Sequence, residues 1–580
     1  MSSDAAAARP WEKYYSDDAK SFDPGNLPLT LLSEFPVVAA RDFGSRPALT
    51  TLLPNGATAM LTYDELNEYS DAFAAYLREV CGLKQGDVVA VQSPNCVDYP
   101  VAVFGALKAG CICTNVNPLY TETEMEFQLQ DSAAKALVII DLFGDKVDSV
   151  IAKTNIKHVI RMSLTDFFPP MKKLIVGFVL KYVRKMVPTM KTPCVAFTDA
   201  LTQGRAKLDG GVKLSKYTAG IDPNQTAVYQ YTGGTTGRAK GAELTHHNII
   251  TNALQMSAVL DEGVYPENDQ GVILVVLPLY HIFAFTVCVM NGMLNGAHAI
   301  LIPNPRPLTN VQPAFENYGL TLIPGVNTLF AGLLHEPWFN KSVSSKLLYC
   351  VAGGTALHEA VALAWKEKTG VDICQGYGLT ESSCAISYSP AKAPKLNHIG
   401  IPLPEIDVKI VDEEGNEVAH GEPGELIARG ANIMKGYLNR PDETALTVKD
   451  GWLYTGDVAV MDDDGYLQIV DRKKDMILVS GFNVFPNELE DTIAKLAGVA
   501  EVGVIGVPDE RSGEVPKAFV VKKDPELTED EVMEHCRKSL TGYKLPRHIA
   551  FVDEIPKSPV GKILRKELRQ LDHLGEGVKV

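Results

Sequence analysis

Short apolar runs of β-strand length alternate with longer amphipathic stretches along most of this 580-residue chain. The strand-like runs occupy residues 87–92, 136–141, 271–278 and 297–303. Residues 63–80 have the hydrophobic periodicity of a helix, with Asp64 as a candidate N-cap. Alternation of this kind favours α/β layers. The chain is also too long for one hydrophobic core, so at least two domains are expected.

The pattern of apolar and charged residues changes at the charge cluster DRKKD, residues 471–475. A shorter α+β pattern and a strongly charged tail follow it. We therefore expect a large domain over residues 1–471 and a small one over residues 472–580. A charged, exposed segment between two modules can also act as a hinge, which we expect near Lys474.

The net charge of −16, from 71 acidic and 55 basic residues, argues against general nucleic-acid binding, which needs basic surface. Ten scattered cysteines without paired CxxC motifs argue against a zinc site or a disulfide framework. The N-terminus lacks the apolar region of a signal peptide, so a cytoplasmic location is expected. The uncharged stretch between Asp269 and Arg306 is broken by proline, histidine and asparagine, which favours a buried strand, turn and helix.

A glycine- and threonine-rich loop, YTGGTTGRAKGAELTHHN at residues 231–248, follows the strand-like run 226–230. Its glycines free the backbone to wrap an anion, its threonines offer hydroxyl donors, and Lys240 adds a positive charge. It is not a Walker A loop, because glycine rather than serine or threonine follows Lys240. The composition predicts a phosphate-binding loop.

This loop resembles the phosphate-binding signature of the adenylate-forming superfamily, which includes acyl-CoA synthetases, peptide-synthetase adenylation domains and beetle luciferases. Further signatures follow in the family's order over nearly the whole chain. They are GGTAL (353–357), QGYGLTE (375–381), GELIARGANIMKGY (424–437), GWLYTGD (451–457), DRKKDMILVSGFNVFPNELE (471–490) and PKSPVGKILRKEL (556–568). The overall likeness is to bacterial long-chain fatty acid–CoA ligases.

The resemblance implies a large N-terminal domain of layered sheets and helices and a small mobile C-terminal α+β domain. It also implies a set of residues that bind ATP and CoA: Thr232, Gly233, Gly234, Thr235, Thr236, Gly237, Gly354, Thr355, Gln375, Gly376, Tyr377, Thr380, Asp457, Arg472, Lys474 and Gly481. Within this set, Asp457 and Arg472 would meet the ribose, Tyr377 the adenine, and Gly481 the pantetheine channel.

By the same resemblance, Lys562, Lys240, Glu381 and His281 are the candidate catalytic residues. Thr232 and Glu381 would hold Mg²⁺ against the triphosphate, since this hard cation prefers carboxylate and phosphate oxygens. His281 would begin the helix that lines the acyl pocket, where Phe285 falls at the position of an aromatic gate. The apolar chain through residue 294 suits an alkyl substrate, although ordinary core packing explains it equally well.

The expected reaction joins a fatty acid to AMP, with loss of pyrophosphate, and then transfers the acyl group to CoA. The alternatives are a fatty-acyl or aryl adenylate ligase with another acceptor, such as an acyl carrier protein, and a non-catalytic acyl-binding relative. The basic, apolar segment 171–188 is typical either of a peripheral contact with the inner face of the cytoplasmic membrane or of a surface helix. The sequence leaves the oligomeric state and the chain-length preference open.

Overall fold

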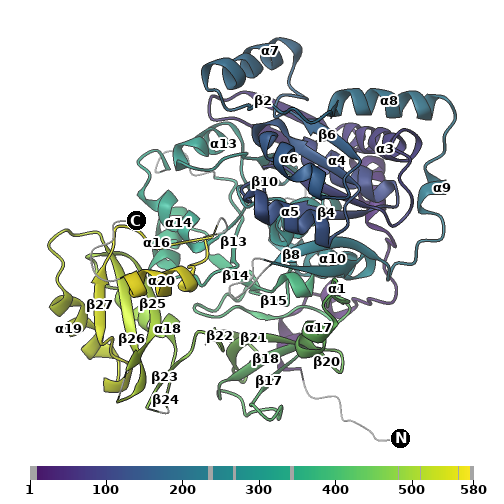
Figure 1. The fold of residues 1–580 in the computed structure, drawn as a ribbon. Helices are drawn as coiled ribbons and strands as arrows, with labels where there is room; N and C mark the ends of the chain where they lie inside the picture. The colour runs from purple at the N-terminus through teal and green to yellow at the C-terminus, as the bar shows by residue number, and fades with distance from the viewer. Residues whose placement is uncertain are drawn as a thin grey trace, which may run out of the picture.

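The structure is a computed structural model that describes residues 9–232, 239–265, 269–339, 345–480, 482–509, 511–558 and 561–574. Figure 1 shows a large domain, coloured purple to green, beside a smaller one in yellow. Six of the residues implicated by the sequence lie outside the described residues: Gly233, Gly234, Thr235, Thr236, Gly237 and Gly481.

An eight-stranded sheet forms one half of the large domain, in the order β19-β9-β8-β4-β3-β5-β6-β7. Its strands are β3 (Val88–Gln92), β4 (Ile112–Val116), β5 (Ala136–Ile140), β6 (His158–Met162), β7 (Val195–Ala196), β8 (Thr226–Thr232), β9 (Lys240–Thr245) and β19 (Gly436–Tyr437). The strands from β8 to β7 are parallel, whereas β9 and β19 are antiparallel to their neighbours. The predicted phosphate-binding loop thus lies in sequence between two adjacent antiparallel strands, β8 and β9.

A nine-stranded sheet forms the second half, in the order β16-β15-β14-β13-β12-β10-β11-β1-β2. Its strands are β1 (Pro47–Leu52), β2 (Thr58–Thr62), β10 (Val272–Val275), β11 (His298–Leu301), β12 (Leu322–Gly325), β13 (Tyr349–Gly353), β14 (Ile373–Tyr377), β15 (Ser387–Tyr388) and β16 (Ile401–Pro402). The strands from β1 to β14 are parallel. Their near-continuous apolar sequences are buried on both faces, as is usual for parallel sheets.

Helices cover both sheets. Those of the large domain are α1 (Asp17–Lys20), α2 (Phe35–Phe43), α3 (Tyr63–Glu79), α4 (Asp98–Lys108), α5 (Glu122–Asp131), α6 (Asp145–Val150), α7 (Pro170–Phe178), α8 (Phe197–Asp209), α9 (Ser215–Thr218), α10 (His246–Val264), α11 (Ile282–Ala284), α12 (Asn291–Leu294), α13 (Gln312–Asn317), α14 (Asn327–His335), α16 (Glu359–Thr369) and α17 (Pro441–Thr447). The predicted helix at 63–80 is confirmed as α3, but its N-cap is Thr62 and not Asp64. Thr62 and Glu65 form a reciprocal capping box, which satisfies the first free N–H groups of the helix.

The uncharged stretch after Asp269 folds into buried elements, as predicted. It forms β10, α11, the π-helix η6 (Phe285–Met290), α12 and β11. Each residue of η6 is buried. Among the described residues, no helix is both long and apolar enough to cross a bilayer.

A small antiparallel sheet closes the large domain, and a second small sheet forms the core of the C-terminal one. The first contains β17 (Asp407–Val411), β18 (Gly424–Arg429), β20 (Val448–Lys449), β21 (Trp452–Met461) and β22 (Leu467–Arg472). The second contains β23 (Ile477–Val479), β24 (Phe482–Val484), β25 (Val499–Asp509), β26 (Gly513–Lys522) and β27 (His548–Phe551), with α18 (Pro486–Ala494), α19 (Glu529–Ser539) and α20 (Arg565–Leu574). The main hydrophobic cluster of the large domain extends from Trp11 to Leu467, and a smaller one there extends from Val88 to Val159. The clusters of the small domain begin at Ile477.

Candidate active site

The carboxylate of Asp457 is held from both sides at the carboxyl end of β14. Asp457 on β21 lies opposite Arg472 on β22, and the Arg472 guanidinium reaches Asp457 Oδ1 at 3.2 Å. The Tyr377 hydroxyl donates a 2.6 Å hydrogen bond to Oδ2. Burial, reinforced by the negative charge of Asp457, raises the pKa of Tyr377 well above its usual range, so this hydroxyl stays a donor. Three residues that the sequence placed at the ribose and adenine are therefore in direct contact.

Glu381 lies in a short 3₁₀ turn, η8 (Thr380–Ser382), whose last residue is held by the buried side chain of Asn432. The Asn432 amide donates to the Ser382 carbonyl at 3.0 Å, and the Ser383 hydroxyl donates to the Asn432 carbonyl at 2.8 Å. Ser383 has a φ of +61°, a conformation that costs energy outside glycine and requires support from its surroundings. The chain also approaches itself here, because a β-carbon at Gly378 would lie 1.8 Å from the Cys384 carbonyl oxygen.

A chain of contacts connects Glu381 to Lys240. The Tyr437 hydroxyl donates to Glu381 Oε1 at 2.6 Å, and Lys240 Nζ lies 5.0 Å from the centre of the Tyr437 ring. Lys240 also pairs with Glu443, the next acidic residue along this surface. A cavity of about 260 Å³ opens beside these groups, lined by Glu381, Tyr437 and Gly456 among others. Lys240 therefore lies behind one wall of the cavity, over the ring of Tyr437, and its charge is paired with Glu443.

The loop that carries Lys562 reaches from the small domain onto the large one. A β-carbon at Gly561 would lie 3.0 Å from Thr328 Oγ1, and one at Gly354 would lie 3.8 Å from Lys562 Cε. The Lys562 ammonium is close enough to Asp457 and Glu381 for their charges to act on it. Burial, together with the positive charge of Arg472, nevertheless lowers the pKa of Lys562 to about 8.

His281 is the N-cap of α11, as predicted, and its Nδ1 accepts a 3.3 Å hydrogen bond from the Phe283 backbone N–H. Burial and the nearby positive charge of Lys562 lower the pKa of His281 to about 4, so the ring is neutral at pH 7. Phe285, the candidate gate, is fully buried within η6. The neighbouring ring of Phe283 packs beside Gly353 and lies 3.1 Å from the position that a β-carbon there would occupy.

The remaining sequence-predicted residues surround the ends of β13 and β14. Gln375 and Gly376 lie opposite Ala352 and Gly353 in the parallel register. The Gln375 amide donates to the His398 carbonyl at 3.2 Å. Thr380 is buried, and Thr355 Oγ1 is buried without a hydrogen-bond partner among the described residues. A buried hydroxyl in that state leaves a donor and an acceptor for a ligand.

The donor set suits a magnesium ion only together with phosphate oxygens. Thr232 ends β8, and η8, which carries Glu381, packs against β8 and β9. One carboxylate with a hydroxyl is a normal protein contribution for Mg²⁺, which takes its other ligands from water and substrate phosphates. Within the part of the chain that the structure describes, no group of three or more histidine, cysteine or acidic side chains is arranged to bind a metal alone.

Arg565, which the sequence reasoning missed, holds the Lys562 loop to the body of the small domain. Its guanidinium contacts both Glu490 oxygens at 2.9 and 3.0 Å and the Asn487 side-chain oxygen at 2.8 Å. It also reaches Asp475 at 3.4 Å. Arg565 lies three residues beyond Lys562, so this buried network fixes where the loop begins its helix, α20.

Tyr437, Glu443 and Asn432 were also missed as site residues. Tyr437 and Asn432 lie inside the motif GELIARGANIMKGY, but the motif did not predict what either residue does. The pairing of β9 with β19 brings Tyr437 beside Lys240. Glu443 follows on α17 and carries no signal of its own, because its relation to Lys240 depends on that long-range strand pairing.

Comparisons with known proteins identify the family of this chain. The chain matches the model "AMP-binding enzyme" over residues 37–438 and "AMP-binding enzyme C-terminal domain" over residues 488–562. It is 46% identical to the long-chain-fatty-acid–CoA ligase of Escherichia coli O157:H7 over 88% of this chain and 90% of that protein.

Solved structures share the fold over nearly the full length. The anthranilate CoA ligase AuaEII in complex with anthranoyl-AMP is 25% identical, with a TM-score of 0.83, covering 95% of this chain and 99% of that one. ATP-bound MatB from Rhodopseudomonas palustris is 26% identical, with a TM-score of 0.78, covering 93% and 98%. This chain, with its large N-terminal and smaller C-terminal domain, belongs to the AMP-binding enzyme family and has the adenylate-forming fold.

Proposed function

We propose that this protein is a long-chain fatty acid–CoA ligase that forms an acyl-adenylate from ATP and then an acyl-CoA. The 46% identity to a protein of that name over most of both chains supports the substrate class. The observation that carries the chemistry is the position of Lys562, whose Cε lies beside Gly354 on the large domain. A cation from the small domain thereby faces the group of residues around Asp457 and Glu381.

In the first half-reaction, a carboxylate oxygen attacks the α-phosphorus of ATP, and the bond to the β-phosphate oxygen breaks to release pyrophosphate. Asp457 Oδ2 accepts a hydrogen bond from Tyr377, and Oδ1 contacts Arg472. Each oxygen keeps a second lone pair that can accept a hydrogen bond from a ribose hydroxyl. Lys240 and Lys562 would neutralise charge that develops on the phosphates. Preorganised charges of this kind supply much of the catalysis in such reactions.

Magnesium, when bound at Thr232 and Glu381, would neutralise phosphate charge. The Tyr437 hydroxyl orients the Glu381 carboxylate toward that task through its 2.6 Å hydrogen bond. Lys240 must exchange Glu443 for a phosphate when ATP binds. The side chains of Lys240 and Glu443 are each about one-third exposed. Exposed ion pairs of this kind contribute only about 0.2–1 kcal/mol, so breaking this one costs little free energy.

In the second half-reaction, the CoA thiolate attacks the acyl carbon, and the carbon–oxygen bond to AMP breaks. We propose that the small domain, residues 472–580, rotates about Lys474 between the two steps. The rotation would withdraw Lys562 and bring Gly481 toward the CoA channel. The change of hydrophobic cluster between Leu467 and Ile477 supports a boundary at this point.

Two assays on the purified protein test the proposal. ATP–pyrophosphate exchange is measured with palmitate, octanoate, benzoate and 4-coumarate, and AMP release is measured with and without CoA. We expect exchange with palmitate in the absence of CoA and sustained AMP release only when CoA is present. Exchange without CoA-dependent turnover would indicate another acceptor, such as an acyl carrier protein. Preference for the aromatic acids would refute the fatty-acid assignment.

A further inference from the structure

A helical arm on the large domain presents its apolar face to solvent. The arm spans residues 170–186 and consists of α7, the π-helix η5 (Val179–Val183) and the three residues that follow. Figure 1 shows α7 at the outer edge of the large domain, far from the small one. Eight large apolar side chains on the arm are 37–75% exposed: Met171, Leu174, Ile175, Phe178, Val179, Tyr182, Val183 and Met186.

The spacing of these residues shows that they form one stripe. Met171, Leu174, Ile175 and Phe178 recur at intervals of three and four residues, so they lie along a single side of α7. The exposed apolar surface continues through η5 with Val179, Tyr182 and Val183 and ends at Met186. Val176 and Leu180, on the opposite side, pack against the core of the large domain. A surface helix normally buries its apolar stripe and exposes its polar side. Here a continuous stripe remains outside, and exposed patches of this kind mark interaction sites.

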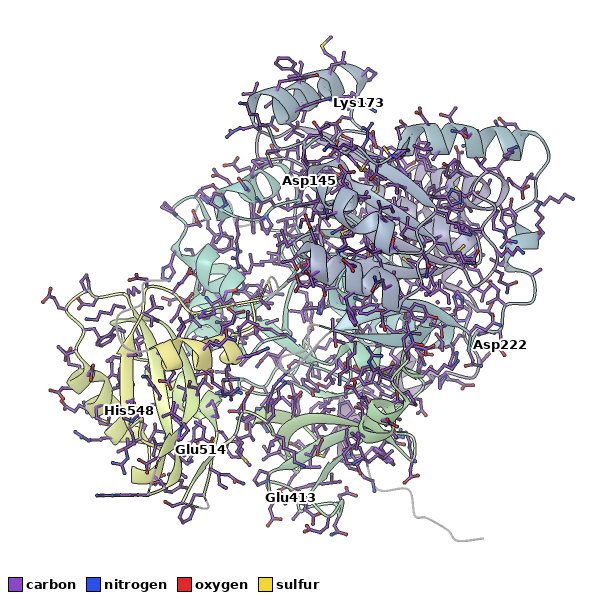
Figure 2. All side chains as sticks on the ribbon, viewed as in Figure 1. Asp145, Lys173, Asp222, Glu413, Glu514 and His548 are labelled. Atoms are coloured by element: carbon purple, nitrogen blue, oxygen red, sulfur yellow. The ribbon has the colours of Figure 1, made fainter. Side chains whose placement is uncertain are left out.

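The charges of the arm select its partner. Residues 170–186 contain Lys172, Lys173, Lys181, Arg184 and Lys185 and no acidic residue, in a chain whose net charge is −16. Lys173, labelled in Figure 2, lies 3.3 Å from Asp166 and so ties the arm to the domain. The other four cations are exposed beside the apolar stripe. A protruding apolar stripe with flanking cations matches a helix that lies in the headgroup region of a bilayer.

We propose that the arm, residues 170–186, docks this protein on the surface of an anionic lipid bilayer. Each basic residue near such a surface adds about 1 kcal/mol of electrostatic attraction. The apolar side chains add the free energy of moving their surface out of water. A second copy fits poorly, because a twofold contact would place the two basic arms against each other. The proposal rests on the proposed function in one respect: docking would bring the site to a membrane from which a long-chain acid can be drawn.

Vesicle co-sedimentation tests the docking directly. The full chain is mixed with vesicles of phosphatidylcholine alone or with one-third phosphatidylglycerol. We expect binding to the anionic vesicles that weakens at high ionic strength. The double variant L174E/F178E should reduce binding about tenfold or more, since two anchors become acidic. The double variant K181E/R184E should remove the preference for phosphatidylglycerol. Val37→Glu replaces an apolar residue that is 50% exposed on α2, away from the arm, and should bind like wild type.

Activity measurements separate this proposal from the ligase assignment. L174E/F178E should use octanoate in solution at the wild-type rate but should use palmitate embedded in anionic vesicles several-fold more slowly. Wild-type vesicle binding by both double variants would overturn the docking surface. A change of oligomeric state in L174E/F178E, measured by light scattering, with no vesicle binding by wild type would assign the stripe to a protein contact instead. Vesicle binding without any ligase activity would refute the proposed function alone.

Discussion

His358, at the start of α16 in the large domain, lies 2.9 Å from Asp491 on α18 of the small domain, measured from Nδ1 to Oδ1. Lys495 and Glu359 form a second pair across the same boundary at 3.2 Å. With the contact of Gly561 against Thr328, these pairs hold the arrangement in which Lys562 faces the large domain. These polar contacts would have to break in the domain rotation that we propose.

This docking should weaken as the pH rises. Burial alone would lower the pKa of His358, but the Asp491 carboxylate outweighs it, and the pKa is raised above the ordinary 6.5. The docked state thus binds more protons than the detached one. The His358–Asp491 pair therefore stabilises docking fully below about pH 6.5, and this stabilisation is lost as the pH rises through the raised pKa of His358. The pair is partly exposed, so the effect on the docking equilibrium should not exceed about fivefold. Tryptic cleavage in the 471–475 segment should accelerate with pH in wild type more than in His358→Gln. Identical pH dependence of the two proteins would contradict a role for the pair.

Asp457→Asn should weaken ATP binding more than it slows the chemical step. Asparagine keeps the size of the side chain but loses the charge that Arg472 pairs with and that would accept hydrogen bonds from the ribose. Hydrogen bonds to charged groups contribute about 1.5–3 kcal/mol, so the KM for ATP should rise about 10–100-fold in pyrophosphate exchange. Tyr377→Phe removes a single hydrogen bond to the same carboxylate and should cost less. An unchanged KM in both variants would show that ATP does not contact this group.

Much of the fold was predictable because each element carries its own signal. The runs at 87–92 and 136–141 became β3 and β5 within one residue at each end, since buried parallel strands are apolar throughout. The N-cap of α3 was missed although its signal was present: Thr62 and Glu65 have capping-box spacing. Asp64 was preferred only because it stands near the start of the periodic stretch.

The contacts within the site were less predictable, because they depend on long-range pairing. The motifs identified Asp457, Arg472 and Tyr377, but not that the tyrosine hydroxyl contacts the carboxylate. The gate role of Phe285 was implied by resemblance alone and stays a prediction. That Phe285 is fully buried in a π-helix, η6, had no signal in the motif. Arg565 lies inside the motif at 556–568, but its role was not predictable, since its acceptors lie 61 to 90 residues away.

The charge of Lys562 should limit adenylate formation at high pH. Burial and Arg472 lower its pKa to about 8 in the unliganded protein, so above that pH the amine is neutral and offers no charge to the phosphates. Because kcat/KM reports the pKa values of the free enzyme, kcat/KM for ATP should fall above about pH 8. Lys562→Ala should nearly abolish pyrophosphate exchange at every pH. Lys562→Arg keeps its charge and should shift the decline beyond pH 10, whatever its absolute rate. A wild-type profile that stays flat to about pH 9.5 would exclude this lysine as the titrating group.

Lys474→Pro should separate the two half-reactions. Lys474 lies in the turn between β22 and β23, where a rotating domain must change backbone dihedral angles. Proline fixes φ near −65° and so removes most of that freedom. The structure has Lys562 beside Gly354, so a trapped protein should retain adenylate formation and lose thioester formation. Both steps are measured on the same preparation, as pyrophosphate exchange with palmitate and as CoA-dependent AMP release.

Lys474→Ala is the matched control for that variant. Alanine removes the same side chain, including whatever contacts it makes, but leaves φ free, so both half-reactions should continue. Equal losses in Lys474→Pro would indicate general damage, which thermal unfolding would reveal as a lowered Tm. Normal thioester formation in Lys474→Pro would show that the domains do not rotate about this residue, and the hinge would then have to lie elsewhere between β22 and β23. Loss of thioester formation in both variants would assign the effect to the ammonium group rather than to backbone rotation.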